Sequence, residues 1–507
     1  MNNELSLYLL QALAVMAVLF IVAIGVGVLS IIVIYIIDKT QTTQAVRYNF
    51  PVIGRFRYLF EHLGEFFRQY FFSQDREEMP FNRAERAWVY RAAKNLDNTI
   101  AFGSTYDLTK PGAVIFPNTA FPTLGIDAVE TAPVTIGPYC EKPYLARSLF
   151  NMSAMSYGAI SKPAVLALSE GAAKAGCWLN TGEGGLSKYH LAYKPDIVFQ
   201  LGTAKFGVRD INGDLNDNKL RELGANDCIK MFEVKLSQGA KAGMGGLLPG
   251  DKVTPEIAAI RGITVGETCH SPNRHIDVSN VSELLNLIAR IRQVTGKPCG
   301  FKTVIGDTEW LDDLCGEIKK RGIESAPDFI TIDSGDGGSG AAPQSLMDYV
   351  GLPIQESLPR VIDLLSRHQI RERIKIIASG KMITPAGACW ALCVGADFIS
   401  SARGFMFALG CIQALQCNRN TCPTGITTHN VKLQKGLDPR LKSERIANYV
   451  KNMLLGIGNI AHSCGVEDPR HLTRKHVRIV VSYGHSKPFS ELYPPVAQIN
   501  TRNDAAA

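Results

Sequence analysis

The chain has 507 residues, of which 46% are hydrophobic and 20% charged, and its formal net charge at pH 7 is +7. This composition excludes a largely disordered chain, and the length allows one large domain with appendages or two domains. The basic residues form no block of five or six, so nothing favours nucleic-acid binding. The 12 cysteines do not follow the regular pairing of a secreted disulfide framework, which favours a reducing compartment.

The chain begins with an apolar segment. The 33 residues from Leu5 to Ile37 contain no charged residue, and about 20 apolar residues are enough to cross a bilayer. A cleaved signal peptide would have a basic start and a shorter apolar core; a buried core helix is the other alternative. Lys39 and Arg47 follow the segment, and no Lys or Arg precedes it. The sequence therefore predicts a transmembrane anchor over residues 1–40, single-pass in the inner (cell) membrane, with the catalytic domain on the cytoplasmic side.

Residues 41–145 are expected to form a juxtamembrane, partly helical lead-in. Within them, residues 47–72 interleave Phe, Tyr and Leu with Arg, Glu and His. Such a stretch can lie at the bilayer interface, with its rings at headgroup depth and its arginines at the phosphates. A helix packed on the main domain fits equally well. Residues 77–94 predict a helix that begins near Arg83.

From residue 146 onward, β-rich runs alternate with amphipathic helical stretches. The clearest β-rich runs are 229–237, 298–306, 328–334, 375–379 and 396–401, and the clearest helical stretches are 282–294, 310–322 and 358–370. Alternation with near-continuous apolar strands indicates a parallel sheet covered by helices. Sustained over about 260 residues, it predicts an α/β fold, a (β/α)8 TIM barrel, over residues 146–440. Residues 441–478 predict two helices, and 486–507 a poorly ordered tail.

Glycine-rich loops follow three late strands. GDGGSG follows 328–334, Gly-Lys follows 375–379, and Ala-Arg-Gly follows 396–401. Active sites of such barrels lie at the C-terminal ends of the strands, where loop amides, serine hydroxyls and Arg403 can bind a phosphate. One such loop is commonly an ordinary turn, whereas three at consecutive strand ends indicate a phosphate-bearing cofactor.

Three cysteines lie close together after the last predicted strand. Cys411, Cys417 and Cys422 have the spacing C-x5-C-x4-C, and Pro and Gly follow the last. Three thiolates in a loop rich in Asn, Thr, Pro and Gly can bind one iron–sulfur cluster. Because no fourth ligand is in view, a 3Fe-4S cluster fits better than a four-iron one. The alternative is that these cysteines are small buried residues.

This cysteine loop resembles the cluster loop of the FMN-binding synthase domain of glutamate synthase. The likeness continues through MSYGAIS (155–161), NTGEGG (180–185), residues 238–262 and SGDGGSG (334–340), and covers roughly residues 150–430 in the family's order. The resemblance implies a TIM barrel that carries FMN and an iron–sulfur cluster. Electrons from the cluster would reduce FMN, and the flavin would reduce the imine of a 2-oxo acid. In glutamate synthase that imine comes from 2-oxoglutarate and ammonia, and the product is glutamate.

The resemblance also implies roles for individual residues. Lys302, Glu233 and Lys241 would be catalytic, with Lys302 as a cation that stabilises reduced flavin. Glu233 and Lys235 alternate with Val234, so both would project to one face of a strand. Lys241 is the first candidate for the substrate carboxylates, and Lys252, Arg274 and His275 are the others. The expected FMN contacts are Met155, Ser156, Asn180, Thr181, Glu233, Lys302, Asp336, Gly337, Gly338, Ser379, Gly380, Ala402 and Arg403.

The sequence leaves the oxo acid, the nitrogen source and the electron donor of the reaction open. The family's AKPGEGG is AKAGMGG here, and its Ser-Glu-Val-Gly run is replaced by Ile305, Gly306 and Asp307, both near the expected oxo-acid site. No glutaminase domain precedes the apolar segment, so ammonia or another amine is expected as the nitrogen source. No dinucleotide fingerprint occurs, which predicts a separate electron donor such as a ferredoxin-like protein or a reductase subunit. The alternatives are an N-methylglutamate synthase-type enzyme and a membrane-bound flavin/iron–sulfur electron-transfer subunit.

Overall fold

The computed structural model describes residues 2–494 and residue 496. The chain divides into two compact units, Met1–Ala84 and Glu85–Ala507. We describe each unit by itself.

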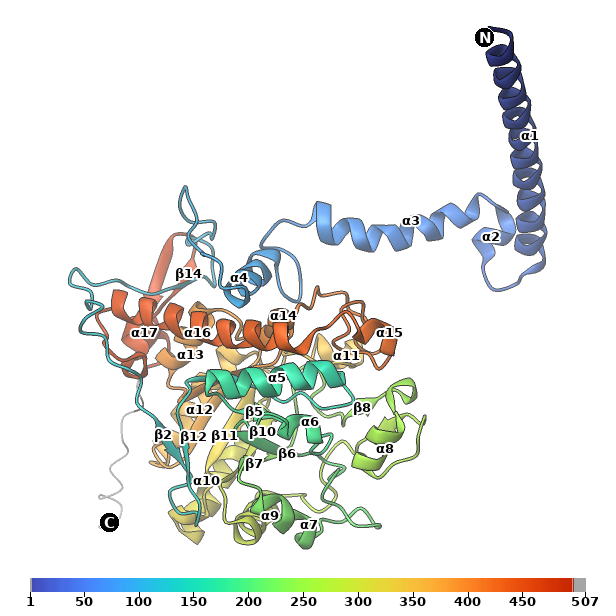
Figure 1. Cartoon of the computed structure of the whole chain (residues 1–507). Coiled ribbons are helices and arrows are strands. Elements are labelled where there is room, and N and C mark those ends of the chain that lie inside the picture. Colours follow the sequence, from blue (N-terminus) through green and yellow to red (C-terminus); the bar gives the residue numbers. More distant parts are fainter. Residues whose placement is uncertain (1, 495, 497–507) are drawn as a thin grey trace, which may run out of the picture. The chain divides into compact units, whose positions relative to one another are not determined.

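The first unit begins with the long helix α1 (Asn2–Thr40), shown in dark blue in Figure 1. An 18-residue stretch of its segment Ser6–Thr40 has a mean hydropathy of 3.1, and no residue of that stretch is buried, so by length and composition the helix can cross a membrane. Helices α2 (Ala45–Asn49) and α3 (Gly54–Phe67) follow, and a π-helical turn (Arg68–Phe72) extends α3.

The second unit is built around eight parallel strands. In chain order they are β4 (Phe150–Met152), β5 (Leu179–Asn180), β6 (Ile197–Leu201), β7 (Ile229–Lys235), β10 (Cys299–Val304), β11 (Phe329–Asp333), β12 (Lys375–Ser379) and β13 (Phe398–Ser401). Their order in the sheet, β4-β13-β12-β11-β10-β7-β6-β5, places the first strand between the second and the eighth once the sheet curls. At that seam the backbone N–H of Met152 donates to the Trp178 carbonyl (3.1 Å). The predicted (β/α)8 barrel is confirmed.

A helix follows each strand and covers the barrel (Figure 1). These helices are α5 (Lys162–Ala175), α6 (Lys188–Leu191), α7 (Asp217–Ala225), α9 (Val281–Thr295), α10 (Glu309–Arg321), α12 (Ile354–Arg367), α13 (Pro385–Val394) and α14 (Arg403–Leu409). Local signals fix several ends: the Asn280 side chain caps α9 by accepting from Glu283 N (2.9 Å), and Gly296 ends it at φ +69°. Each predicted β-rich run contains one observed strand, and 375–379 coincides with β12.

One end of the barrel is filled with apolar side chains. Trp178, Met231, Phe329 and Phe398 form a buried cluster there with residues of the paired strands β2 (Val134–Ile136) and β3 (Tyr144–Ala146). Phe329 and Phe398 are the first residues of their strands, so this is the N-terminal end of the barrel. The opposite end, where the strands finish, is left for polar groups.

An insertion and short elements surround the barrel. Between β7 and β10 lie β8 (Leu247–Leu248), a 3-10 turn (Gly250–Lys252), α8 (Pro255–Arg261) and β9 (Cys269–His270). The other short elements are α11 (Gln344–Met347), α15 (Val431–Gln434) and 3-10 turns at Ile323–Ser325, Pro469–His471 and Arg474–His476. The predicted helix near Arg83 is confirmed as α4 (Arg83–Ala93), and residues 94–145 after it contain only the short strands β1–β3 within the described structure.

The C-terminal segment differs from the prediction. In place of two helices over 441–478 there is one 25-residue helix, α16 (Pro439–Ser463), which packs along α5. The expected tail also begins too early: β14 (Arg478–Ser482), β15 (His485–Pro488) and α17 (Phe489–Leu492) are ordered elements. Strand β1 (Val114–Ile115) pairs with β14, and this long-range pairing gives no local sequence signal. The rest of the predicted tail, residues 495 and 497–507, lies outside the described residues.

Candidate functional site

A large cavity lies at the C-terminal end of the barrel. It encloses about 1020 Å³, including the part open to solvent, and its walls come from the loops after β4, β5, β7, β11 and β13 and from the β7–β10 insertion. A second cavity of about 470 Å³ shares Gln200, Lys235, Gln238 and Arg403 with it, so the two are continuous. The predicted catalytic and FMN-binding residues that line these two cavities are Met155, Ser156, Lys241, Lys302, Gly338, Ser379, Gly380, Ala402 and Arg403.

Lys302 lies at the base of this site with a carboxylate partner. Its ammonium is 3.0 Å from Asp333 Oδ2 and 3.4 Å from Ser153 Oγ, and the side chains of Lys302 and Asp333 are both buried. Burial lowers the pKa of Lys302, but Asp333 and Glu233 outweigh burial and raise it above the ordinary value. Its carboxylate neighbours therefore favour the charged ammonium of Lys302. Asp333 was not among the predicted site residues. The sequence could have indicated it, because it is a carboxylate at the end of an otherwise apolar strand.

Glu233 is held below the cavity by hydrogen bonds on both oxygens. Oε1 accepts from Asn180 Nδ2 (2.8 Å) and Gln200 Nε2 (2.7 Å), and Oε2 accepts from Thr331 Oγ1 (2.6 Å). A carboxylate satisfied in this way is fixed in place. It is suited to orienting its neighbours and to balancing the Lys302 charge.

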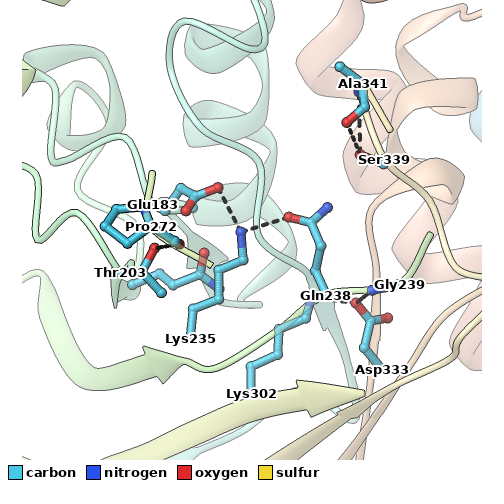
Figure 2. Close-up of polar contacts among 12 residues, drawn as sticks. Glu183, Thr203, Lys235, Gln238, Gly239, Pro272, Lys302, Asp333, Ser339 and Ala341 are labelled. Carbon is cyan, nitrogen blue, oxygen red and sulfur yellow. Dashed lines mark hydrogen bonds and ion pairs between the residues drawn. The ribbon is translucent and has the colours of Figure 1, made fainter. Parts of the chain in front are cut away.

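Lys235 joins two residues that sequence reasoning did not select. Its ammonium is 2.6 Å from Glu183 Oε1 and 2.7 Å from Gln238 Oε1 (Figure 2). Burial raises the pKa of Glu183, but Lys235, Lys241 and Arg261 together bring it below the ordinary value. Glu183 is the acidic residue of the motif NTGEGG (180–185), so the sequence could have indicated it as a site residue.

Lys241 is buried in the cavity wall without a partner. Its side chain is 4% exposed, and within the described part of the chain no hydrogen bond or ion pair reaches its ammonium. Burial, reinforced by the neighbouring charge of Lys235, lowers the pKa of Lys241 from 10.5 to about 8. A buried ammonium with unused donors is a binding group for an anion that enters the cavity.

The other three substrate candidates lie in different surroundings. Lys252 lines the cavity, but its ammonium donates to the carbonyls of Ala159 (2.6 Å) and Cys417 (3.2 Å). His275 is buried, and its Nε2 is 3.0 Å from the Lys235 carbonyl. Arg274 is exposed and donates to backbone carbonyls of His275 and Val278. The structure brings only Lys252 of these to the cavity beside Lys241.

The late-strand loops form the polar side of the second cavity. Its lining includes Ser379, Gly380, Lys381, Ala402 and Arg403, together with Gly338. Gly380 has φ +104°, and a Cβ there would clash with the Ser334 side chain. This position requires glycine. Amides, hydroxyls and two cations in one recess are the donor set that a phosphate needs.

The remaining predicted cofactor residues divide into two groups. Met155 and Ser156 line the large cavity, while Asn180 lines a small space beneath it. Thr181 is buried, and its hydroxyl is engaged with the Gly182 carbonyl (3.0 Å) and the Gln200 N–H (3.1 Å). Asp336 pairs with Lys381 (2.6 Å), and neither it nor Gly337 lines the two joined cavities.

The three loop cysteines share a separate small cavity. Cys411, Cys417 and Cys422 all line a space of about 320 Å³, and Cys417 and Arg403 line the large cavity as well. Within residues 2–494 and 496, no group of three or more His, Cys, Asp or Glu side chains is arranged around a metal position. Three thiols that line one cavity are suitable ligands for an iron–sulfur cluster, but their sulfur atoms do not converge on a single metal position. The cluster stays a prediction.

A family profile and the curated relatives agree on one family. A family profile described as "Conserved region in glutamate synthase" matches residues 115–467, which is more than half of the chain. The Glutamate synthase large subunit-like protein YerD of Bacillus subtilis (strain 168) is 40% identical over 504 residues, covering 91% of this chain and 95% of that protein.

More distant relatives match a smaller share of the chain. The Archaeal-type glutamate synthase [NADPH] of Thermotoga sp. (strain RQ2) is 34% identical over 316 residues, and the match spans 62% of this chain and 59% of that protein. Among solved structures, a mutant of a chimeric (S)-mandelate dehydrogenase has a TM-score of 0.46 at 12% identity, covering 77% of this chain and 98% of that one. On the family profile and the B. subtilis relative, the chain belongs to the glutamate synthase family and is a glutamate synthase-like oxidoreductase of the class acting on CH-NH2 donors.

Proposed function

We propose that this protein reduces the imine formed from 2-oxoglutarate and ammonia, giving glutamate. The observation that carries the proposal is the charge of the cavity. Lys235, Lys241, Lys252 and Arg403 all line it, and within the described residues the only carboxylate in its wall is Glu183. Such a cavity favours an anionic ligand with more than one negative charge.

Lys241 is the residue that we assign to a substrate carboxylate. Lys235 is already engaged with Glu183 and Gln238, and Lys252 with two carbonyls, whereas the Lys241 donors are unused. An incoming carboxylate would supply the missing partner and hold Lys241 protonated. Gln238 and Lys235 stand close enough in sequence and space to orient the same ligand.

The residues of the second cavity fit FMN. Ser379, Gly380, Lys381, Gly338 and Arg403 would hold the phosphate. If FMN is held there, its reduced form would supply a hydride for the imine carbon, and the imine nitrogen would take its proton from solvent. Lys302, held by Asp333, contributes a fixed positive charge that favours the reduced anionic ring.

We assign Cys411, Cys417 and Cys422 as thiolate ligands of an iron–sulfur cluster. A bound cluster supplies single electrons from a separate donor protein. The cavity of the cysteines shares Cys417 and Arg403 with the large cavity, so the two spaces adjoin there. Helix α1 would anchor the protein in the inner membrane, with the barrel on the cytoplasmic side, as the positive-inside rule predicts.

The test is acceptor-dependent reoxidation. The full chain is reduced under anaerobic conditions and mixed with 2-oxoglutarate plus ammonia, 2-oxoglutarate plus methylamine, or pyruvate plus ammonia. We expect rapid flavin reoxidation and glutamate only with the first mixture. Reoxidation with methylamine alone would reassign the amine, and pyruvate acting as well as 2-oxoglutarate would refute the dicarboxylate site. No reoxidation by any mixture would show an electron-transfer subunit without its own organic substrate.

A further inference from the structure

We propose that helix α3, with the π-helical turn after it, lies flat on an anionic lipid surface and is a second membrane contact beside α1. The proposal rests on the membrane span proposed above. It concerns the first compact unit alone.

The apolar side chains of α3 form one stripe. Phe56, Leu59 and Phe60 are exposed, and Phe60 is 66% exposed. Spacings of three and four residues place them on the same side of a helix. Phe67 and Phe71 continue the stripe, with ring centroids 5.5 Å apart, and are also exposed.

Charged and polar residues occupy the other side of the same helix. Arg57, Glu61, His62 and Arg68 fall between the apolar positions, about 100° to 240° around the helix from Phe56 at 3.6 residues per turn. The segment is therefore amphipathic but not hydrophobic all round. This is the pattern of a helix that lies in a membrane surface and not across a membrane.

An ion pair between a buried carboxylate and a partly exposed arginine fixes where α3 begins. Asp38, in the last turns of α1, is fully buried, and its carboxylate is 2.7 Å from the Arg55 guanidinium. The same carboxylate accepts from the backbone N–H of Val52 at 3.0 Å. Asp38 is the first charged residue after the 33 uncharged ones, so it marks the boundary of the apolar segment. Arg55 thereby holds the start of α3 at that boundary.

From this point α3 leads away from the end of α1 and does not fold back along it (Figure 1). If α1 crosses the bilayer, α3 leaves laterally from the level of the headgroups. A stripe of phenylalanines at that depth reaches the acyl chains.

The cations of the segment favour anionic headgroups. Residues 39–72 contain five Lys and Arg against two Asp and Glu, and Arg55 is neutralised by Asp38, which leaves four cations and two anions. Lys39 lies over the Tyr48 ring (4.6 Å) and Arg47 over the Tyr58 ring (4.9 Å). Cations stacked on aromatic rings are well placed between headgroup phosphates and apolar chains.

Quenching by brominated lipid tests the proposal in the full chain. Phe60→Trp reports the stripe, and His62→Trp, two residues along on the polar side, is the matched control. Each variant is reconstituted in phosphatidylcholine/phosphatidylglycerol vesicles with or without bromine on the acyl chains. The wild-type chain, measured in the same vesicles, gives the signal of the four native tryptophans, and this signal is subtracted from that of each variant. We expect at least twofold stronger quenching at position 60 than at position 62, and weaker quenching at position 60 when phosphatidylglycerol is omitted.

Equal, weak quenching at both positions would overturn the proposal and show that protein covers the stripe. Quenching at position 60 that is unchanged without phosphatidylglycerol would overturn the role of anionic lipid. Carbonate extraction of the same vesicles tests α1 separately: release of the wild-type chain would refute the span on which the proposal rests. Retention in carbonate with no quenching at position 60 would refute α3 alone.

Discussion

Lys241→Met should stabilise the fold and weaken substrate binding at the same time. In the folded protein, burial lowers the pKa of Lys241 from 10.5 to about 8. One pKa unit corresponds to about 1.4 kcal/mol, so keeping this lysine charged in the cavity costs folding roughly 3 kcal/mol as an upper bound. Methionine is of similar length and carries no charge, so the substitution removes most of this cost without opening a cavity.

The sign of the effect depends on pH. The pKa of Lys241 is lower in the folded chain than in the unfolded one, so the cost is fully present below about pH 8 and disappears as the pH rises towards 10.5. At pH 7 we therefore expect Lys241→Met to raise the free energy of unfolding, measured by urea denaturation, by about 1–3 kcal/mol. Near pH 10.5 the two proteins should be equally stable.

Binding should change in the opposite direction. A charge-assisted hydrogen bond to a carboxylate contributes about 1.5–3 kcal/mol, so Lys241→Met should raise KM for 2-oxoglutarate by roughly 10- to 150-fold. In the wild-type protein kcat/KM for the oxo acid should fall above about pH 8 as the Lys241 ammonium loses its proton. Lys241→Arg stays charged and should reduce that fall.

Lys297→Met is the matched control. Burial also lowers the pKa of Lys297 to about 8, but its ammonium donates to the carbonyls of Asn226 (2.7 Å) and Ile229 (2.5 Å) at the other end of the barrel. Its removal takes a donor from both carbonyls, of which that of Asn226 still accepts from the Ile229 N–H (3.1 Å), and should destabilise the fold without changing KM. The reasoning is refuted if Lys241→Met destabilises the protein as Lys297→Met does, or if its KM for the oxo acid is unchanged.

Cys417→Ser should remove iron and leave FMN bound, because the cysteines and the phosphate loops are separate ligand sets. The control Cys393→Ser, in α13, should keep both iron and FMN. A full iron content in the Cys417→Ser protein would exclude Cys417 as a ligand. Lys302→Met should lower the midpoint potential of bound FMN, because it removes a buried cation and leaves the Asp333 carboxylate without its cationic partner. A redox titration with no change would place Lys302 away from the flavin. Asp328→Asn should lower the free energy of unfolding by about 3–5 kcal/mol, since this fully buried carboxylate is paired with an arginine at 2.8 Å; wild-type behaviour in urea would contradict this.

The sequence predicted the barrel because its signals are local. The run 375–379 has three apolar residues, Ile376 to Ala378, between Lys375 and Ser379 and is followed by Gly380, and it coincides with β12. Strands β4, β5 and β6 were not among the clearest runs; β4 and β5 have only three and two residues, too few for a periodicity to show, whereas β6 has five. The C-terminal pairing of Val114 with Ile479 joins residues far apart in the chain, so no local pattern announced it.

For the site, sequence alone determined the kind of residues and the strand ends that carry them, including Lys302, Lys241 and the glycine-rich loops. Only the tertiary structure decided which of these side chains are paired and which are buried without a partner. It paired Lys302 with Asp333 and Lys235 with Glu183, and it left Lys241 buried without a partner. The physical reason is that a side chain's charge depends on its desolvation and on its neighbours in space. Both are set by strands and loops that are distant in sequence and meet only when the barrel closes.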